Sequence, residues 1–123
     1  PDLLNHLAEK LISGKRQVIQ IFHKFEFPKR KGAPKNALQI KFLQEEAYTT
    51  TIPAQLVKKF NCKIVPIYIE RIDDVNFTLT INNSIEYSND HSIKDITLDL
   101  NQRIEKMILN RPEQWIWSHN RWK

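Results

Sequence analysis

The sequence predicts an α/β fold, in which helices flank a sheet built from short strands. Three observations support this class. Residues 52–60 place apolar side chains at helical spacing and lead directly into an apolar, β-branched run at 64–69. Residues 75–81 alternate between apolar and polar side chains, as a half-buried strand does. Residues 93–109 repeat apolar residues on one face of a helix.

The N-terminal part is expected to hold a helix, a strand and a loop. Asp2 is a suitable N-cap, and leucines recur at helical spacing, so we predict an amphipathic helix over 3–13 that ends at Ser13-Gly14. The β-branched run at 18–22 predicts a short strand. Residues 24–37 contain two prolines and a glycine, which prevent a regular element and predict a solvated loop.

The loop 24–37 is strongly basic, with five Lys or Arg side chains against one glutamate. It has two functional interpretations besides a solvated loop. Each basic residue close to an anionic membrane surface contributes about 1 kcal/mol to binding, and Phe25 and Phe27 would enter such an interface. The same aromatic residues permit stacking on single-stranded nucleic acid. No RNA- or DNA-binding signature accompanies them, so the sequence favours the membrane surface and predicts no nucleic-acid partner.

The middle of the chain is expected to contain a strand, a loop, a helix and a second strand. Residues 38–42 alternate as a short strand, and a threonine-rich loop before Pro53 is typical of a helix start. Asn61 is a suitable terminator of this helix. The run at 64–69 is nearly all apolar, as in a strand covered on both faces, and Pro66 requires an edge position or a bulge there.

The C-terminal part is expected to hold a hairpin and a long helix. The alternating strand 75–81 is followed by a turn at Asn82-Asn83 and by Ser84–Tyr87 as the returning strand. Ser92 and Asp95 have the spacing of a capping box at the start of the helix, which Pro112 ends. No repeat and no second domain is recognised, so residues 1–123 are expected to form a single unit.

The composition is that of one small globular domain. The chain has 123 residues, of which 41% are hydrophobic and 27% charged. Its net charge of +5 favours an anionic partner such as nucleic acid, a lipid headgroup or a phosphorylated substrate. Cys62 is the single cysteine, which excludes an internal disulfide and indicates a reducing compartment. No window of about 18 apolar residues is present, so we expect no membrane-spanning helix here.

The residues that usually carry catalysis or bind metals are scattered. The four histidines lack a second ligand at metal-binding spacing, so we predict no metal site. Asp73-Asp74 is expected in a solvated turn, and Cys62 is expected to be a packed thiol rather than a nucleophile. The sequence therefore predicts no catalytic residue within this chain.

The tail 111–123 contains three tryptophans at close spacing, with basic residues among them. Two interpretations remain open. The indoles pack the tail onto the body of the domain, or they form the apolar wall of a site for an anionic ligand. In the second case Arg111, His119 and Arg121 would donate to the anion, with Lys123 beside them.

Two stretches resemble the bacterial lipid A biosynthesis (lauroyl/myristoyl) late acyltransferase family. The central one runs from Phe42-Leu43 to Lys63-Ile64-Val65-Pro66, and the closing one reads Pro112-Glu113-Gln114-Trp115-x-Trp117-x-His119-x-Arg121. Two positions depart from the family pattern, since Gln44 stands where glycine is common and Asn120 where arginine is usual. The resemblance covers residues 38–123. It implies the C-terminal half of a glycerol-phosphate-acyltransferase-like domain, with a mixed sheet flanked by helices.

The resemblance implies transfer of a fatty acyl chain from acyl carrier protein to a lipid A precursor, without a metal or organic cofactor. It implies a position at the cytoplasmic face of the bacterial inner membrane, peripheral for this segment. We expect Arg111, His119 and Arg121 to bind the phosphorylated substrate. The family's general base lies in an upstream His-x4-Asp/Glu motif, which no histidine of this chain satisfies. The alternative is therefore a non-catalytic fragment, or the product of a split reading frame, that acts as a docking subunit.

Overall fold

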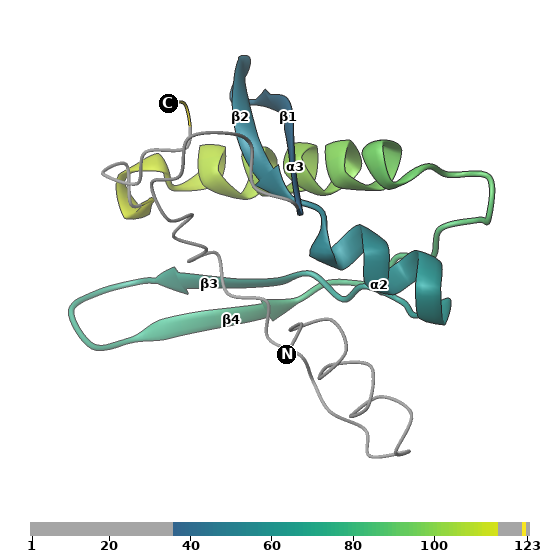
Figure 1. The fold of residues 1–123 in the computed structure, drawn as a ribbon. Helices are drawn as coiled ribbons and strands as arrows, with labels where there is room; N and C mark the ends of the chain where they lie inside the picture. Colours follow the sequence, from purple (N-terminus) through teal and green to yellow (C-terminus); the bar gives the residue numbers. More distant parts are fainter. Residues whose placement is uncertain (1–35, 116–121, 123) are drawn as a thin grey trace, which may run out of the picture.

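The computed structural model describes residues 36–115 and Trp122 (Figure 1). The helix predicted at 3–13, the strand predicted at 18–22 and the basic loop up to residue 35 lie outside the described residues. The described elements follow in the order β1 (Ala37–Phe42), β2 (Glu45–Thr50), α2 (Ile52–Phe60), β3 (Ile67–Arg71), β4 (Phe77–Ile81), α3 (Ile93–Asn110) and a 3-10 turn η1 (Pro112–Gln114). This mixed arrangement confirms the predicted α/β class, and its strands form two separate antiparallel pairs.

The β1–β2 hairpin closes through a two-residue turn, because Phe42 lies opposite Glu45 in the ladder. The turn residues Leu43 and Gln44 have φ angles of 51° and 70°, and this pair of positive angles matches the right-handed twist of the flanking strands. The prediction that the chain loops between β1 and the helix was wrong. The sequence did not predict strand β2, because neither turn residue is Asn or Gly and the strand begins with two glutamates.

Helix α2 forms where it was predicted. Pro53 stands in its first turn, where a missing N–H costs nothing. Asn61 ends the helix in the left-handed conformation, and its N–H donates to the Val57 carbonyl at 2.8 Å. Thr51 occupies the N-cap position but makes no capping bond. Its hydroxyl instead donates to the Asn36 carbonyl at 3.1 Å, which holds the start of β1 against the start of α2.

Strands β3 and β4 pair antiparallel, and the ladder continues beyond β3 with Ile64 paired to Ile85. Between the pairs Ile64–Ile85 and Ile67–Ile81, the two residues Val65-Pro66 lie opposite the three residues 82–84. The second segment therefore has one extra residue, which forms a bulge of the kind predicted from Pro66. The predicted return of Ser84–Tyr87 as a hairpin strand was wrong, because Ile85 pairs with Ile64. The prediction of a strand covered on both faces was also wrong, since Ile67 and Ile69 are 43% and 60% exposed.

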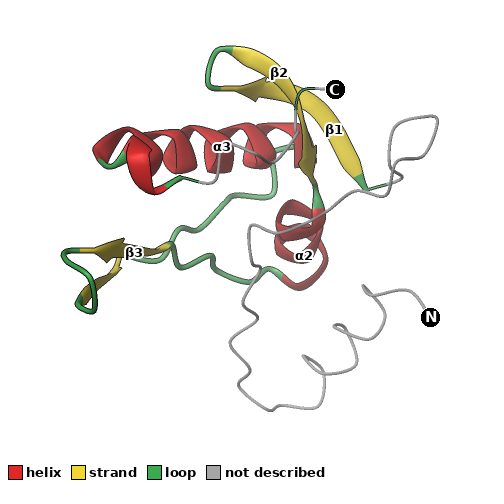
Figure 2. Cartoon of the chain, turned by 90° about the vertical axis from the view of Figure 1, so that its left-hand side faces the viewer, coloured by secondary structure: helices red, strands yellow, loops and turns green. Residues whose placement is uncertain are grey.

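Helix α3 begins at the predicted capping box. The Ser92 hydroxyl accepts from the Asp95 N–H at 3.1 Å, and the Asp95 carboxylate accepts from the Ser92 N–H at 2.9 Å. The helix contributes to two buried clusters, Phe42 with Ala47 and Ile108, and Ala54 with Val57 and Ile96. Figure 1 and Figure 2 show the β1–β2 and β3–β4 hairpins toward opposite sides of this helix.

Candidate ligand-binding site at the end of the β3–β4 hairpin

Arg111 is the one predicted substrate-binding residue within the described part of the chain, and His119 and Arg121 lie outside it. Arg111 follows α3 directly, and its Nε donates to the Glu70 carboxylate of β3 at 2.5 Å. Its Nη1 lies 3.7 Å from the Glu113 carboxylate. The hydrogen bond to Glu70 and the charge of that carboxylate raise the pKa of Arg111 above its usual value. Arg111 therefore links the tail to β3, and two carboxylates lie beside its guanidinium.

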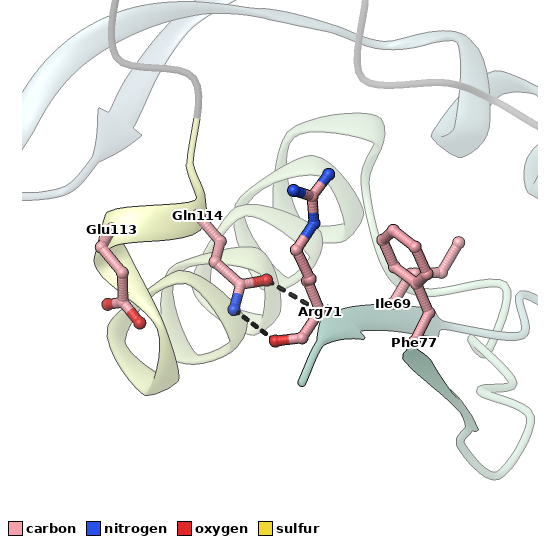
Figure 3. A pocket seen from close by; sticks show the side chains of 5 residues that line it. All are labelled: Ile69, Arg71, Phe77, Glu113 and Gln114. Atoms are coloured by element: carbon pink, nitrogen blue, oxygen red, sulfur yellow. Dashed lines mark hydrogen bonds between the residues drawn. The ribbon is translucent and has the colours of Figure 1, made fainter. Parts of the chain in front are cut away.

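Gln114 makes a second link between the tail and β3. The Arg71 N–H donates to the Gln114 side-chain oxygen at 2.9 Å, and the Gln114 side-chain NH2 donates to the Arg71 carbonyl at the same distance (Figure 3). The amide of Gln114 thus pairs with the end of β3 as a neighbouring strand would. The Pro-Glu-Gln stretch of the tail consequently has a structural role, which the spacing alone did not reveal.

A cavity of about 400 Å³ lies between this link and the hairpin, lined by Ile69, Arg71, Phe77, Glu113 and Gln114. The Arg71 guanidinium stands 5.2 Å from the centre of the Phe77 ring, at a distance typical of a cation–π contact. No ion pair joins that guanidinium to a carboxylate among the described residues. Figure 3 shows Ile69, Arg71 and Phe77 pointing to the same side of the sheet. The cavity thus combines one cationic group with an apolar wall.

Sequence reasoning missed Arg71 as a candidate. Its position at the end of a predicted strand carried no functional signal. The cavity depends on the strand register that places Phe77 opposite Arg71. It also depends on the contact between Arg71 and Gln114, which lie 43 residues apart in the sequence. Glu70, Arg71, Arg111 and Glu113 together carry no net charge. The site is therefore suited to one anionic group bound at Arg71 rather than to a polyanion.

The tryptophans of the tail pack onto the body of the domain where they are described. Trp115 and Trp122 contact Phe42, with ring centroids 6.3 and 6.2 Å apart. This confirms the packing interpretation for these two indoles, and Trp117 lies outside the described residues. The Trp122 indole Nε1 is buried and has no hydrogen-bond partner among the described residues. The hollow beside Trp122 is lined by Glu45 and Glu46, whose charges disfavour an anion there.

The remaining polar clusters have structural explanations. The Asp73 carboxylate accepts from the side-chain NH2 of Asn76 and from the N–H groups of Val75 and Asn76. These bonds confirm the predicted turn and lower the pKa of Asp73. Burial raises the pKa of the Cys62 thiol, so this side chain remains protonated and is a poor nucleophile. No group of three or more metal-ligating side chains occurs within residues 36–115.

Two segments of the chain resemble a known family. They are the central segment and the closing motif that contains Gln114. The family of bacterial lipid A biosynthesis acyltransferases matches residues 18–123. The chain belongs to this family. The match begins earlier than the stretch 38–123 on which the resemblance rested, and it leaves residues 1–17 outside. No curated protein and no solved structure matches the chain.

Membership of this family assigns the chain to acyl transfer in lipid A biosynthesis. The acceptor in this reaction is a lipid A precursor. The family is associated with the bacterial inner membrane. Within the described part of the chain, neither helix has the length and apolar character needed to cross a membrane.

Proposed function

We propose that this chain serves the transfer of a fatty acyl group from acyl carrier protein to a hydroxyl group on a lipid A precursor, at the cytoplasmic face of the inner membrane. Family membership supports the general reaction. The observation that supports a substrate-binding role for this segment is the Arg71 guanidinium, without an ion pair among the described residues and beside the apolar Ile69 and Phe77. A phosphorylated lipid offers both an anionic group and an apolar surface to such a site.

In this reaction the role of the chain is to bind the phosphorylated substrate. Arg111, His119 and Arg121 are proposed to contact phosphate, and Arg71 joins them from the end of β3. A charge-assisted hydrogen bond contributes about 1.5–3 kcal/mol to binding. Glu70 accepts from the Arg111 Nε, whereas Nη1 lies 3.7 Å from the Glu113 carboxylate, a separation too long for a hydrogen bond. Glu70 would thereby orient the guanidinium, and a phosphate would displace the more distant Glu113.

The chemical step requires a general base that removes the proton of the acceptor hydroxyl. None of His6, His23 and His91 is followed by Asp or Glu at the fifth position. We therefore propose that the base comes from outside residues 1–123. We expect these residues by themselves to bind the phosphorylated lipid and not to transfer an acyl group.

Vesicle binding tests this proposal. The chain is sedimented with phosphatidylcholine vesicles that contain or lack lipid A, and its Arg71→Gln variant is compared with Arg103→Gln, a matched control on α3 whose guanidinium pairs with Asp99. We expect binding that depends on lipid A, falls with added salt and weakens about tenfold in Arg71→Gln only. Equal binding by both variants would refute the role of Arg71. Acyl transfer from acyl carrier protein above a heat-treated control would refute the expected lack of activity.

A non-catalytic docking subunit is the second candidate, favoured by the missing His-x4-Asp/Glu motif in the sequence. In that case the chain would stimulate acyl transfer by a full-length member of the family when the two are mixed. The Arg71→Gln variant would stimulate as well as the wild type. Lipid A binding that depends on Arg71, without any stimulation, favours the first proposal.

A further inference from the structure

Strand β3 exposes its apolar side chains and half-buries its polar ones. Ile67 and Ile69 are exposed, whereas Tyr68 and Glu70 are half-buried. Glu70 accepts from Arg111 of the tail, so the polar side of the strand meets the rest of the described fold. An antiparallel pair with one apolar and one polar face normally packs the apolar face on the core. The inverted arrangement indicates that the apolar side is suited to contact with something other than water.

Three successive cross-strand pairs form this outer surface of the hairpin. They are the pairs Ile67–Ile81, Ile69–Leu79 and Arg71–Phe77. Residues directly opposite each other in an antiparallel ladder point to the same side, as Figure 3 shows for Arg71 and Phe77. Leu79 and Ile81 are 55% and 65% exposed. We call the surface of these six residues the hairpin face, and it runs from a guanidinium at one end to aliphatic side chains at the other.

We propose that the hairpin face binds the hydrocarbon chain of an anionic lipid whose phosphate is held at Arg71. This inference rests on the proposed function and extends the same site beyond the cavity. The hydrocarbon chain leaves the cavity between Ile69 and Phe77 and continues over Leu79. One ligand therefore occupies both the cavity and the hairpin face, and the two do not compete.

The length of the hairpin face suits a fatty chain. Arg71 and Ile67 are four residues apart in β3, which corresponds to about 14 Å along a strand. Half of the hydrocarbon core of a bilayer is about 15 Å thick, and one layer of fatty chains fills it. A chain that starts from a phosphate at Arg71 therefore ends near the pair Ile67–Ile81.

The distribution of charge favours an amphiphile with its anion at one end. Arg71 is the only charged residue of the hairpin face, and no ion pair joins it to a carboxylate among the described residues. A second copy of the chain, packed face to face, would bury this guanidinium without a carboxylate partner, because the hairpin face contains none. A lipid phosphate pairs with the guanidinium while its hydrocarbon chain removes the aliphatic side chains from water.

Titration with alkyl phosphates tests the proposal, because the chain length varies while the phosphate stays the same. Binding of butyl phosphate and of dodecyl phosphate is measured by NMR on the full chain, with dodecyl phosphate kept below its micelle-forming concentration. We expect dodecyl phosphate to bind about a hundredfold more tightly, since the longer chain buries more apolar surface. Equal affinities for the two probes would overturn the proposal.

Leu79→Ala tests the position of the chain. It should weaken binding of dodecyl phosphate about fivefold and leave butyl phosphate unchanged, because Leu79 lies beyond the residues that line the cavity. The matched control is Leu109→Ala, at a 68% exposed position on α3, which should bind both probes as the wild type does. Equal affinities of the two variants for dodecyl phosphate would overturn the proposal.

Arg71→Gln separates this inference from the proposed function. We expect it to weaken binding of both probes about tenfold. Unchanged binding of both probes would refute the anion site and this inference together. Weaker binding in Arg71→Gln without any effect of Leu79→Ala would refute the hydrocarbon site alone. Sedimentation without ligand is the last check, and a dimer that Leu79→Ala dissociates would show that a second copy occupies the hairpin face and would overturn the proposal.

Discussion

Asn101 of α3 is hydrogen-bonded to the hydroxyl of Thr49 in β2, with 2.9 Å between its side-chain nitrogen and the oxygen. The same nitrogen donates to the Lys41 carbonyl of β1 at 3.1 Å. Asn101 is 1% exposed, so this amide joins both strands of the hairpin to the helix from a buried position. The contact therefore defines how the hairpin sits on α3.

Asn101→Ala should lower the free energy of unfolding by about 2 kcal/mol, because the Lys41 carbonyl and the Thr49 hydroxyl both lose the hydrogen bond from the Asn101 amide. Asn101→Asp should cost more, since a carboxylate cannot donate and its charge would be buried. Urea denaturation measures both. The neighbouring exposed Gln102→Ala is the control and should change stability little. Equal effects of Asn101→Ala and Gln102→Ala would contradict the role of the amide.

Gln44→Gly should raise the free energy of unfolding by about 1 kcal/mol, because Gln44 has a φ angle of 70° that glycine adopts without a steric penalty. Gln39→Gly in the extended part of β1 is the matched control and should destabilise the protein instead. Denaturation midpoints of the two variants provide the comparison. A loss of stability in Gln44→Gly would argue against the two-residue turn.

Tyr87→Phe should reduce the loss of stability at alkaline pH. Burial, together with the hydrogen bond to Asp99 at 2.5 Å, raises the pKa of Tyr87. The folded protein therefore keeps this proton above pH of about 10, where the unfolded chain releases it, and the free energy of unfolding falls as the pH rises. Identical alkaline profiles for the wild type and Tyr87→Phe would refute the linkage.

Asp99 should contribute to stability in the opposite pH range. Burial raises its pKa, but the hydrogen bonds from Arg103 and Tyr87 outweigh burial, and the pKa lies below its usual value. Its contribution is present above pH of about 4 and disappears as the pH falls through the folded-state pKa. Asp99→Asn should flatten the acid limb of a pH series of urea midpoints. An unchanged acid limb would show that this carboxylate contributes nothing there.

Removal of residues 112–123 should unfold the domain. The deletion takes away Trp115 and Trp122 from the Phe42 cluster and Gln114 from β3. Loss of a large aromatic side chain from a core costs about 3–5 kcal/mol, which is comparable with the stability of a small domain. Circular dichroism against temperature tests this, and an unchanged melting curve would contradict it.

The features predicted correctly from the sequence are those with local causes. The capping box at Ser92, the left-handed Asn61 and the irregular ladder at Pro66 depend on residues a few positions away. Strand β2 was missed because its turn uses Leu43-Gln44, whose conformation is set by packing rather than by preference. The Leu43 N–H donates to the Glu105 carboxylate of α3 at 2.7 Å, and no pattern in the neighbouring sequence predicts that contact.

The candidate site could be predicted only in part, for a similar reason. The sequence predicted Arg111 as a substrate-binding residue, and Gln114 belongs to the closing stretch that resembles the family, whose match over residues 18–123 includes both. Their partners Glu70 and Arg71 lie some forty residues earlier, with separations of 41 and 43 residues. A single sequence contains no information about such pairings, since the register of the tail against β3 is set by tertiary packing.

The position of α3 late in the chain has a consequence for biosynthesis. Ile108 and Ile96 complete the two buried clusters, so the ribosome makes Phe42 and Val57 long before their partners exist. The nascent chain must hold the β1–β2 hairpin and α2 with their apolar surfaces uncovered until α3 has been made. Folding of these elements therefore waits for α3, and chaperones that shield apolar segments should bind the chain before α3 appears.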